Sequence, residues 1–122
     1  MKLNIKGNEY DIIFENDVFL SSYKNQILDG ECSSIDGTIR INKNNDDYNL
    51  DRLILHEIIH AYFYECGLPY YSNDETLVNW IAQNIQDIYS NFEKVKKEIT
   101  DETKSKGNKN DNFNETSERS SG

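Results

Sequence analysis

The sequence predicts an α+β domain in which a small antiparallel sheet, made of two hairpins, packs on two helices. Three observations carry this prediction: alternating apolar residues near the start, a segment at residues 49–66 with a marked helix end, and a long amphipathic pattern at residues 73–99. Alternation with a period of two is typical of half-buried strands, whereas three- and four-residue steps are typical of one helix face. We expect the two helices to pack antiparallel.

Two hairpins are expected in the first part of the chain. The alternating apolar residues of the first hairpin are Leu3, Ile5, Tyr10, Ile12 and Phe14, with a turn signal at residues 7–8. The second hairpin is expected over residues 32–35 and 38–41. Asp36 and Gly37 join its strands, because Asp-Gly readily supplies the two positive-φ residues of a tight turn. Residues 16–30 are ambiguous and are interpreted as a loop with one helical turn.

The two helices are indicated by different signals. The first begins near residue 49 or 50 and ends at Cys66, because Gly67 suits a left-handed residue after a helix and Pro69 prevents continuation. The second begins near Asn73. Its apolar positions form a continuous stripe: Leu77, Val78, Ile81, Ala82, Ile85, Ile88, Tyr89, Phe92, Val95 and Ile99.

Composition sets the domain boundary and excludes two classes of function. From residue 100 onward there is no aliphatic side chain, so we expect a domain at residues 1–99 and a disordered polar tail at residues 100–122. The net charge of −9, with scattered Lys and Arg, argues against nucleic-acid binding. The longest apolar run is too short to span a bilayer, and the N-terminus lacks a signal-peptide core. We therefore expect a cytoplasmic protein in which Cys32 and Cys66 are reduced thiols.

Both histidines of the chain lie in one motif, HEIIH at residues 56–60. On a helix, His56 and His60 project side by side, so their rings can converge on one metal ion. Glu57 can flank the open position of that metal and take a proton from its water without being a ligand. The neighbouring residues are apolar on more than one helix face, where unsatisfied polar groups are costly. The motif therefore predicts a zinc site rather than two polar residues placed by chance in a core helix.

A catalytic zinc site usually has a third protein ligand. Cys66 and Glu65 follow on the same helix, but they point away from the histidine pair. The favoured ligand is Glu75, in the first turn of the second helix, and Asp74 is a weaker alternative. Glu75 also has a competing role, because Ser72 and Glu75 match a capping box in which the glutamate bonds only a backbone N–H.

With ETLVNWIA at residues 75–82, the chain resembles gluzincin-type zinc metallopeptidases. Among these it is most similar to the small ImmA/IrrE-like proteins of bacteria, phages and mobile elements. Their second motif reads E-x-x-A-D/N-x-F-A, and here Val78 replaces the first alanine. The resemblance implies roles for five residues: zinc ligands His56, His60 and Glu75, the general base and acid Glu57, and Asn79, which would orient a ligand histidine.

The expected function is hydrolysis of a peptide bond in a protein substrate by a zinc-dependent endopeptidase. The resemblance implies a helix-turn-helix transcriptional repressor as substrate, and a strand of the second hairpin as the edge that holds it. An additional donor for the oxyanion is needed, and Tyr70 and Tyr71 rank first because their loop must pass the site. Two alternatives stay open: a zinc-binding peptidase-like module that binds a partner protein without cutting it, and an interaction protein whose HExxH is coincidental.

Overall fold

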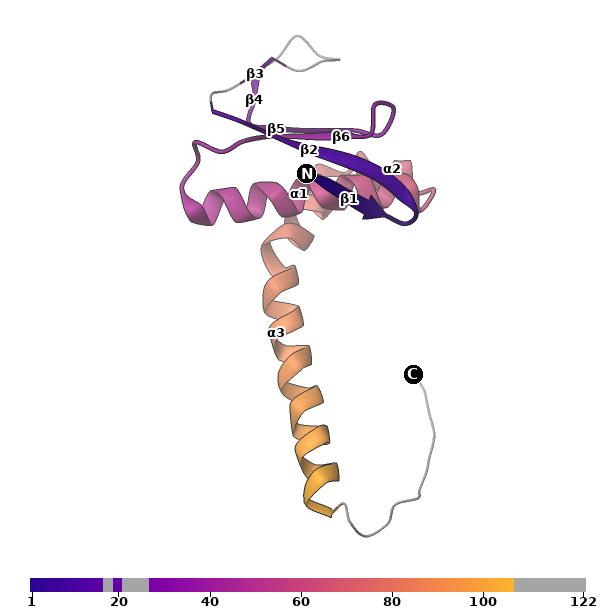
Figure 1. Cartoon of the computed structure of the whole chain (residues 1–122), viewed down its shortest axis with the longest axis vertical. Helices are drawn as coiled ribbons and strands as arrows, with labels where there is room; N and C mark the ends of the chain where they lie inside the picture. Colours follow the sequence, from indigo (N-terminus) through magenta and orange to yellow (C-terminus); the bar gives the residue numbers. More distant parts are fainter. Residues whose placement is uncertain (17–18, 21–26, 107–122) are drawn as a thin grey trace. The chain divides into compact units, whose positions relative to one another are not determined.

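The computed structural model describes the whole chain except residues 17–18, 21–26 and 107–122. The chain divides into two compact units, Met1–Ile85 and Gln86–Gly122, and each is described here by itself. The first unit is α+β, as predicted. It contains a four-stranded sheet, helix α1 (Asp47–Glu65), the short helix α2 (Pro69–Ser72) and the first turns of α3 (Glu75–Lys106). In Figure 1 the sheet lies along α1.

The sheet has the strand order β1-β2-β6-β5, and its first hairpin is confirmed. The strands are β1 (Lys2–Ile5), β2 (Asn8–Glu15), β5 (Gly30–Ser33) and β6 (Thr38–Asn42). The turn between β1 and β2 lies at Lys6 and Gly7, one residue before the expected position. Both residues have positive φ, 53° and 93°. Two positive φ values in succession match the twist of a two-residue hairpin.

The prediction of a wholly antiparallel sheet is wrong, because β2 and β6 pair in parallel at its centre. The chain leaves β2 and passes through β3 (Phe19–Leu20) and β4 (Ile27–Leu28), which pair with each other. It then enters β5 at the sheet edge, so β6 returns in the same direction as β2. A connection of this length permits parallel pairing. Two short strands therefore stand in the segment interpreted as a loop with a helical turn.

The second hairpin, β5 with β6, is confirmed, but its turn differs from the expected two-residue Asp-Gly turn. Residues 34–37 connect the strands, and of Asp36 and Gly37 only the glycine has a positive φ, 66°. The Gly37 N–H donates to the Ser33 carbonyl at 2.9 Å, and the Asp36 N–H donates to the Ser33 hydroxyl at 3.1 Å. Side chains of serine often compete for turn N–H groups in this way, which favours the longer connection.

Two apolar clusters hold α1 in place. The larger one joins the sheet to α1 and consists of Ile5, Tyr10, Ile12, Ile39, Ile41 and Ala61. The smaller one joins α1 to the first turns of α3 and consists of Ile59, Val78 and Ala82. Each large apolar side chain buried in this way contributes about 1.5–3 kcal/mol. Since α1 is packed on both sides, the motif that it carries has a fixed position.

The corner between α1 and α3 is formed by the residues that predicted it. Gly67 has a φ of 75°, its N–H donates to the Tyr64 carbonyl at 3.1 Å, and the Leu68 N–H donates to the Phe63 carbonyl at 2.8 Å. This pair of bonds is the Schellman motif that ends helices. Pro69 then opens α2, a short helix that the sequence did not indicate. The corner returns the chain towards α1 before α3 begins.

The long second helix is confirmed as α3, Glu75–Lys106. It begins two residues after the expected start and continues past the expected domain boundary at residue 99, so residues 100–106 are helical. The rest of the expected tail, residues 107–122, lies outside the described residues. None of the helices in the described part of the chain is long and apolar enough to cross a membrane.

The end of α1 is attached to the first hairpin through Glu65. This carboxylate accepts a hydrogen bond from the Tyr10 hydroxyl at 2.6 Å and another from the Asn8 side chain. Burial of Tyr10 and, to a smaller extent, this hydrogen bond raise the pKa of the phenol above its ordinary value of 10. Glu65 is therefore engaged in anchoring the fold and takes no part in the cluster described next.

Candidate metal centre

Three potential metal ligands converge where α1 meets the start of α3. His56 and His60 project from adjacent turns of α1, and Glu75 is the first residue of α3. The Nε2 atoms of the two histidines are 3.1 Å apart. The Oε1 atom of Glu75 lies 3.0 Å from Nε2 of His56 and 3.4 Å from Nε2 of His60. The three predicted ligands therefore present one atom each to a common point.

The spacing of these atoms fits a tetrahedral zinc ion. Ligand atoms bound at 2.0–2.1 Å with tetrahedral angles stand about 3.3 Å from one another. The observed separations of 3.0, 3.1 and 3.4 Å bracket that value. Two imidazole lone pairs facing each other would repel, whereas a cation between them would satisfy both. Two histidines and one carboxylate are also an established ligand set of catalytic zinc, which leaves the fourth position for water.

The structure separates the two roles considered for Glu75. Asp74 caps α3, because its Oδ1 accepts a hydrogen bond from the Leu77 N–H at 3.1 Å. The Ser72 hydroxyl is directed to His60, and the carboxylate of Glu75 is directed to both histidines. The capping box is therefore absent from this corner of the described chain. Asp74, which was considered as an alternative metal ligand, acts as the cap of α3.

Ser72 orients one of the histidines, a role that sequence reasoning missed. Its side chain is 1% exposed, and its Oγ lies 2.8 Å from Nδ1 of His60. A hydroxyl that accepts a hydrogen bond from Nδ1–H leaves the Nε2 lone pair free for a metal. Asn79 was expected in this role. It is exposed, and among the described residues its side chain makes no hydrogen bond to either histidine.

Substitution of Ser72 by alanine is expected to weaken zinc binding about 10–100-fold, because loss of the group that orients a ligand histidine typically has that effect. Titration of the metal-free protein against a competing chelator measures the change. Asn73→Ala is the matched control, since Asn73 is the exposed neighbour of Ser72 and makes no bond to His60. Equal zinc affinity in Ser72→Ala and the control would remove the orienting role.

Glu57 is a buried carboxylate beside the three ligands. It is 6% exposed, and within the described residues no hydrogen bond or ion pair satisfies it. Two effects raise the pKa of Glu57 from the ordinary 4.5 to about 8: burial, which is the larger, and the negative charges of Glu75 and Glu31. A buried polar group without a partner in the protein requires an explanation, and a bound water or metal-bound ligand would supply one.

The raised pKa of Glu57 predicts how the stability of the metal-free protein depends on pH. Between pH 4.5 and about 8 the folded state binds more protons at Glu57 than the unfolded state does. The free energy of unfolding therefore falls as the pH rises through this range, by at most about 1.4 kcal/mol per pH unit. The lowered pKa of His60 acts in the opposite sense near its ordinary value of 6.5.

Denaturant unfolding of the metal-free wild type and Glu57→Gln at several pH values isolates this contribution. The stability of the wild type relative to the variant should decline steadily from pH 4.5 to 8. A difference that stays constant across the range would show that Glu57 titrates with its ordinary pKa.

Gly30 allows the edge strand β5 to approach Glu57 closely. A Cβ atom at this position would stand 2.8 Å from Cδ1 of Leu53 and 2.9 Å from Oε2 of Glu57, closer than carbon atoms tolerate. A glycine within a strand often marks such a close backbone approach. Residue 30 was placed before the strand by sequence reasoning, so this signal was missed.

A cavity of about 500 Å³ lies over the cluster. Residues 30–35 of β5 and its turn line one part, and the three ligands with Glu57 line another. Tyr64 and Asn73 also border it. Tyr70 and Tyr71, the expected oxyanion donors, are not among its described lining residues: Tyr70 is 81% exposed, and the Tyr71 ring lies 6.1 Å from that of Phe63.

Neither cysteine belongs to the cluster. Cys32 and Cys66 are both free thiols. Cys66, which was expected to point away from the histidines, is exposed at the end of α1. Cys32 borders the cavity, but burial and the charges of Glu57, Glu65 and Glu31 raise the pKa of its thiol to about 12. Its thiolate is therefore scarce near neutral pH, which argues against nucleophilic chemistry at this residue.

Comparison of this chain with protein families, curated proteins and solved structures finds no match. The functional assignment therefore has to rest on the geometry and chemistry of the site.

Proposed function

We propose that this chain is a zinc-dependent endopeptidase with a minimal zincin core, similar to ImmA/IrrE-like gluzincins. One observation carries the proposal. A buried carboxylate, Glu57, which has no partner among the described residues, lies beside three ligand atoms spaced as a tetrahedral zinc site requires. A structural zinc site would be closed by a fourth protein ligand and would have no use for such a carboxylate.

The roles of the residues follow from their positions. His56, His60 and Glu75 would hold the ion, which when bound lowers the pKa of a water and polarises a carbonyl group. Glu57 accepts a proton from the attacking water and donates it to the nitrogen of the leaving amine. Burial raises the pKa of Glu57 in the metal-free protein, and a bound cation would lower this pKa again towards neutral pH, where an acid–base group works best. Ser72 keeps the Nε2 atom of His60 available.

The cavity and its edge strand support an extended peptide as the substrate. β5 is the last strand in the order of the sheet, and residues 30–35 line the cavity. A peptide can add to such an edge through main-chain hydrogen bonds.

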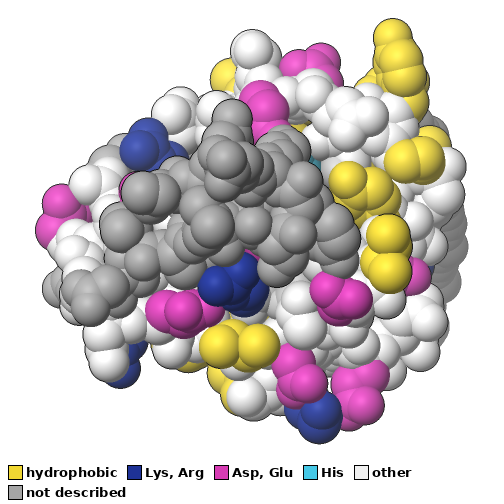
Figure 2. Space-filling model, turned by 90° about the horizontal axis from the view of Figure 1, so that it is seen from above, with side chains coloured by type: hydrophobic (Ala, Val, Ile, Leu, Met, Phe, Trp, Pro, Cys, Tyr) yellow, Lys and Arg dark blue, Asp and Glu magenta, His cyan; other side chains and the backbone are white. Residues whose placement is uncertain are grey.

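On the face shown in Figure 2, acidic and basic side chains of the described residues are interspersed rather than gathered into a basic patch. The resemblance to ImmA/IrrE-like proteins extends the proposal to a helix-turn-helix repressor in the cytoplasm.

Incubation of the zinc-loaded protein with a peptide library, followed by mass spectrometry of new peptide ends, tests this function. We expect cleavage that a chelator abolishes and zinc restores. Repressor proteins encoded beside this gene provide the second set of substrates. If neither set is cut although zinc is bound, the endopeptidase proposal fails, and the alternative of a peptidase-like module that binds a partner protein takes its place.

A further inference from the structure

The apolar stripe of α3 continues into the second unit as a half-exposed surface. Its first members, Val78 and Ile81, pack in the core of the first unit. The later members are between 51% and 59% exposed: Ile88, Tyr89, Phe92, Val95 and Ile99. Isolated helices are marginally stable in water, and most helical stability in proteins comes from packing of the apolar face. A surface of this kind therefore calls for a partner.

The spacing of the stripe specifies what that partner is. From Val78 to Ile99 one row of apolar residues recurs in alternating steps of three and four, at positions 78, 81, 85, 88, 92, 95 and 99, and Ala82 and Tyr89 flank this row. This is a heptad repeat, in which Ile85, Phe92 and Ile99 occupy position a and Ile88 and Val95 occupy position d. Two helices that both carry a repeat of 3.5 residues stay in contact along their length by supercoiling around each other. A second copy of α3 meets that requirement.

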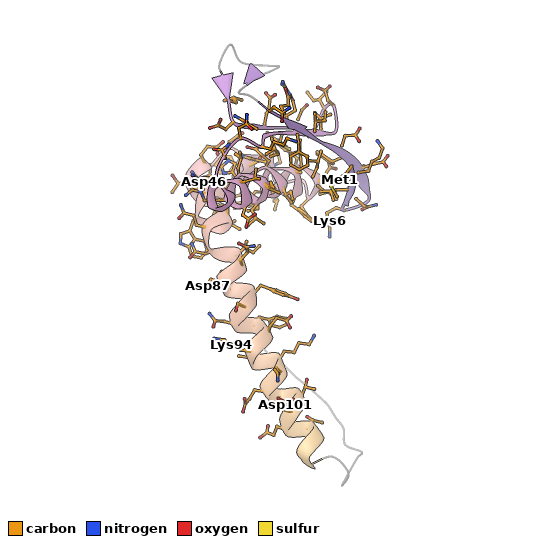
Figure 3. The ribbon with its side chains drawn as sticks, turned by 60° about the vertical axis from the view of Figure 1, so that its left-hand side comes forward. Met1, Lys6, Asp46, Asp87, Lys94 and Asp101 are labelled. Atoms are coloured by element: carbon orange, nitrogen blue, oxygen red, sulfur yellow. The ribbon has the colours of Figure 1, made fainter. Side chains whose placement is uncertain are left out.

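The polar side of α3 conforms to the same repeat. Asp87, Lys94 and Asp101, labelled along the helix in Figure 3, all fall at heptad position c. Residues 86–106 contain acidic and basic side chains in equal number. Helices that lie on anionic membranes instead carry an excess of Lys and Arg on the polar face. The charge pattern therefore favours a protein partner over a lipid surface.

The apolar surface is also large enough for self-association. Five large side chains that are 51% to 59% exposed lie along residues 88–99, and an interface at the lower end of the specific range needs on the order of 600 Å² from each partner. Lys96 at position e and Glu98 at position g lie on opposite flanks of the a/d row, so the row is not flanked by charges of one sign only. We infer that copies of this chain associate through a coiled coil formed by residues 85–99 of α3.

Sedimentation equilibrium of the full-length protein over a range of micromolar concentrations tests this inference. The wild type should show the mass of two or more chains and dissociate on dilution. The double variant Ile88→Asn, Val95→Asn should sediment as a single chain, because two polar residues at position d break the apolar seam. Ser90→Asn, Thr100→Asn places the same residue on the polar side of α3 and should associate like the wild type.

Zinc content, measured on each variant, separates this inference from the proposed function. All three proteins should bind zinc equally, because the substituted residues lie outside the cluster. Ile88→Asn alone serves as a milder second variant, and its association should be weaker than that of the wild type. The inference would be overturned if the wild type remains a single chain at every concentration. It would also be overturned if the wild type associates only with a different protein. A double variant that associates as well as the wild type would overturn it too.

Discussion

Replacement of Glu57 by glutamine is expected to abolish peptide cleavage without releasing zinc. The amide is close in size to the carboxylate, so the close approach of Gly30 to this side chain is retained. It cannot accept the proton of the attacking water, and loss of a positioned general base lowers rates by about 10²–10⁴-fold. Because Glu57 is adjacent to the ligand atoms but is not one of them, the affinity for zinc should change little.

The rate of peptide cleavage and the zinc content, measured on the same sample, test this prediction. Asp51→Asn makes the same change of carboxylate to amide at an exposed position of α1 and should leave both quantities unchanged. A Glu57→Gln protein that cuts peptides at the wild-type rate would show that another group moves the proton. Loss of zinc from Glu57→Gln would instead place this carboxylate among the ligands.

Replacement of Glu75 by alanine is expected to lower the affinity for zinc by more than about 100-fold. Removal of groups that merely orient zinc ligands weakens binding 10–100-fold, and Glu75 supplies a ligand atom itself. The two remaining histidines would still face each other at 3.1 Å but would leave two coordination positions to water. Competition with a chelator of known affinity measures the loss.

Asp74→Ala is the control that separates metal binding from helix capping. Asp74 accepts the hydrogen bond of the Leu77 N–H, so its loss should lower the free energy of unfolding by about 1 kcal/mol and leave zinc affinity intact. Glu75→Ala should give the reverse pattern: a loss of zinc affinity, with little change in the free energy of unfolding of the metal-free protein. If Glu75→Ala binds zinc as tightly as the wild type, the carboxylate has only a structural role.

Features set by local sequence could be predicted. The i, i+4 spacing of His56 and His60 places them together on any helix. Gly67 and Pro69 end the first helix by their own backbone preferences, whatever the rest of the fold. The apolar steps of α3 likewise specify a helix, although they did not show that its later part lies exposed. Glu75 was favoured because the corner after α1 returns the chain towards the histidines.

Features set by contacts between distant segments could not be predicted. Whether β6 lies parallel or antiparallel to β2 depends on the path of the connecting residues, and apolar alternation looks the same in either case. Ser72 was considered only as a cap, in the competing role for Glu75, because its bond to His60 depends on the short helix α2. The need for glycine at position 30 becomes clear only when Glu57 is known to lie against this residue.

The central claim is that His56, His60 and Glu75 together bind one zinc ion, and direct measurement of metal content tests it best. Purified full-length protein, stripped with a chelator and then equilibrated with zinc, should retain one zinc ion per chain by elemental mass spectrometry after gel filtration. The triple variant His56→Ala, His60→Ala, Glu75→Ala should retain none. Wild-type protein that is folded but leaves the column without zinc would contradict the account.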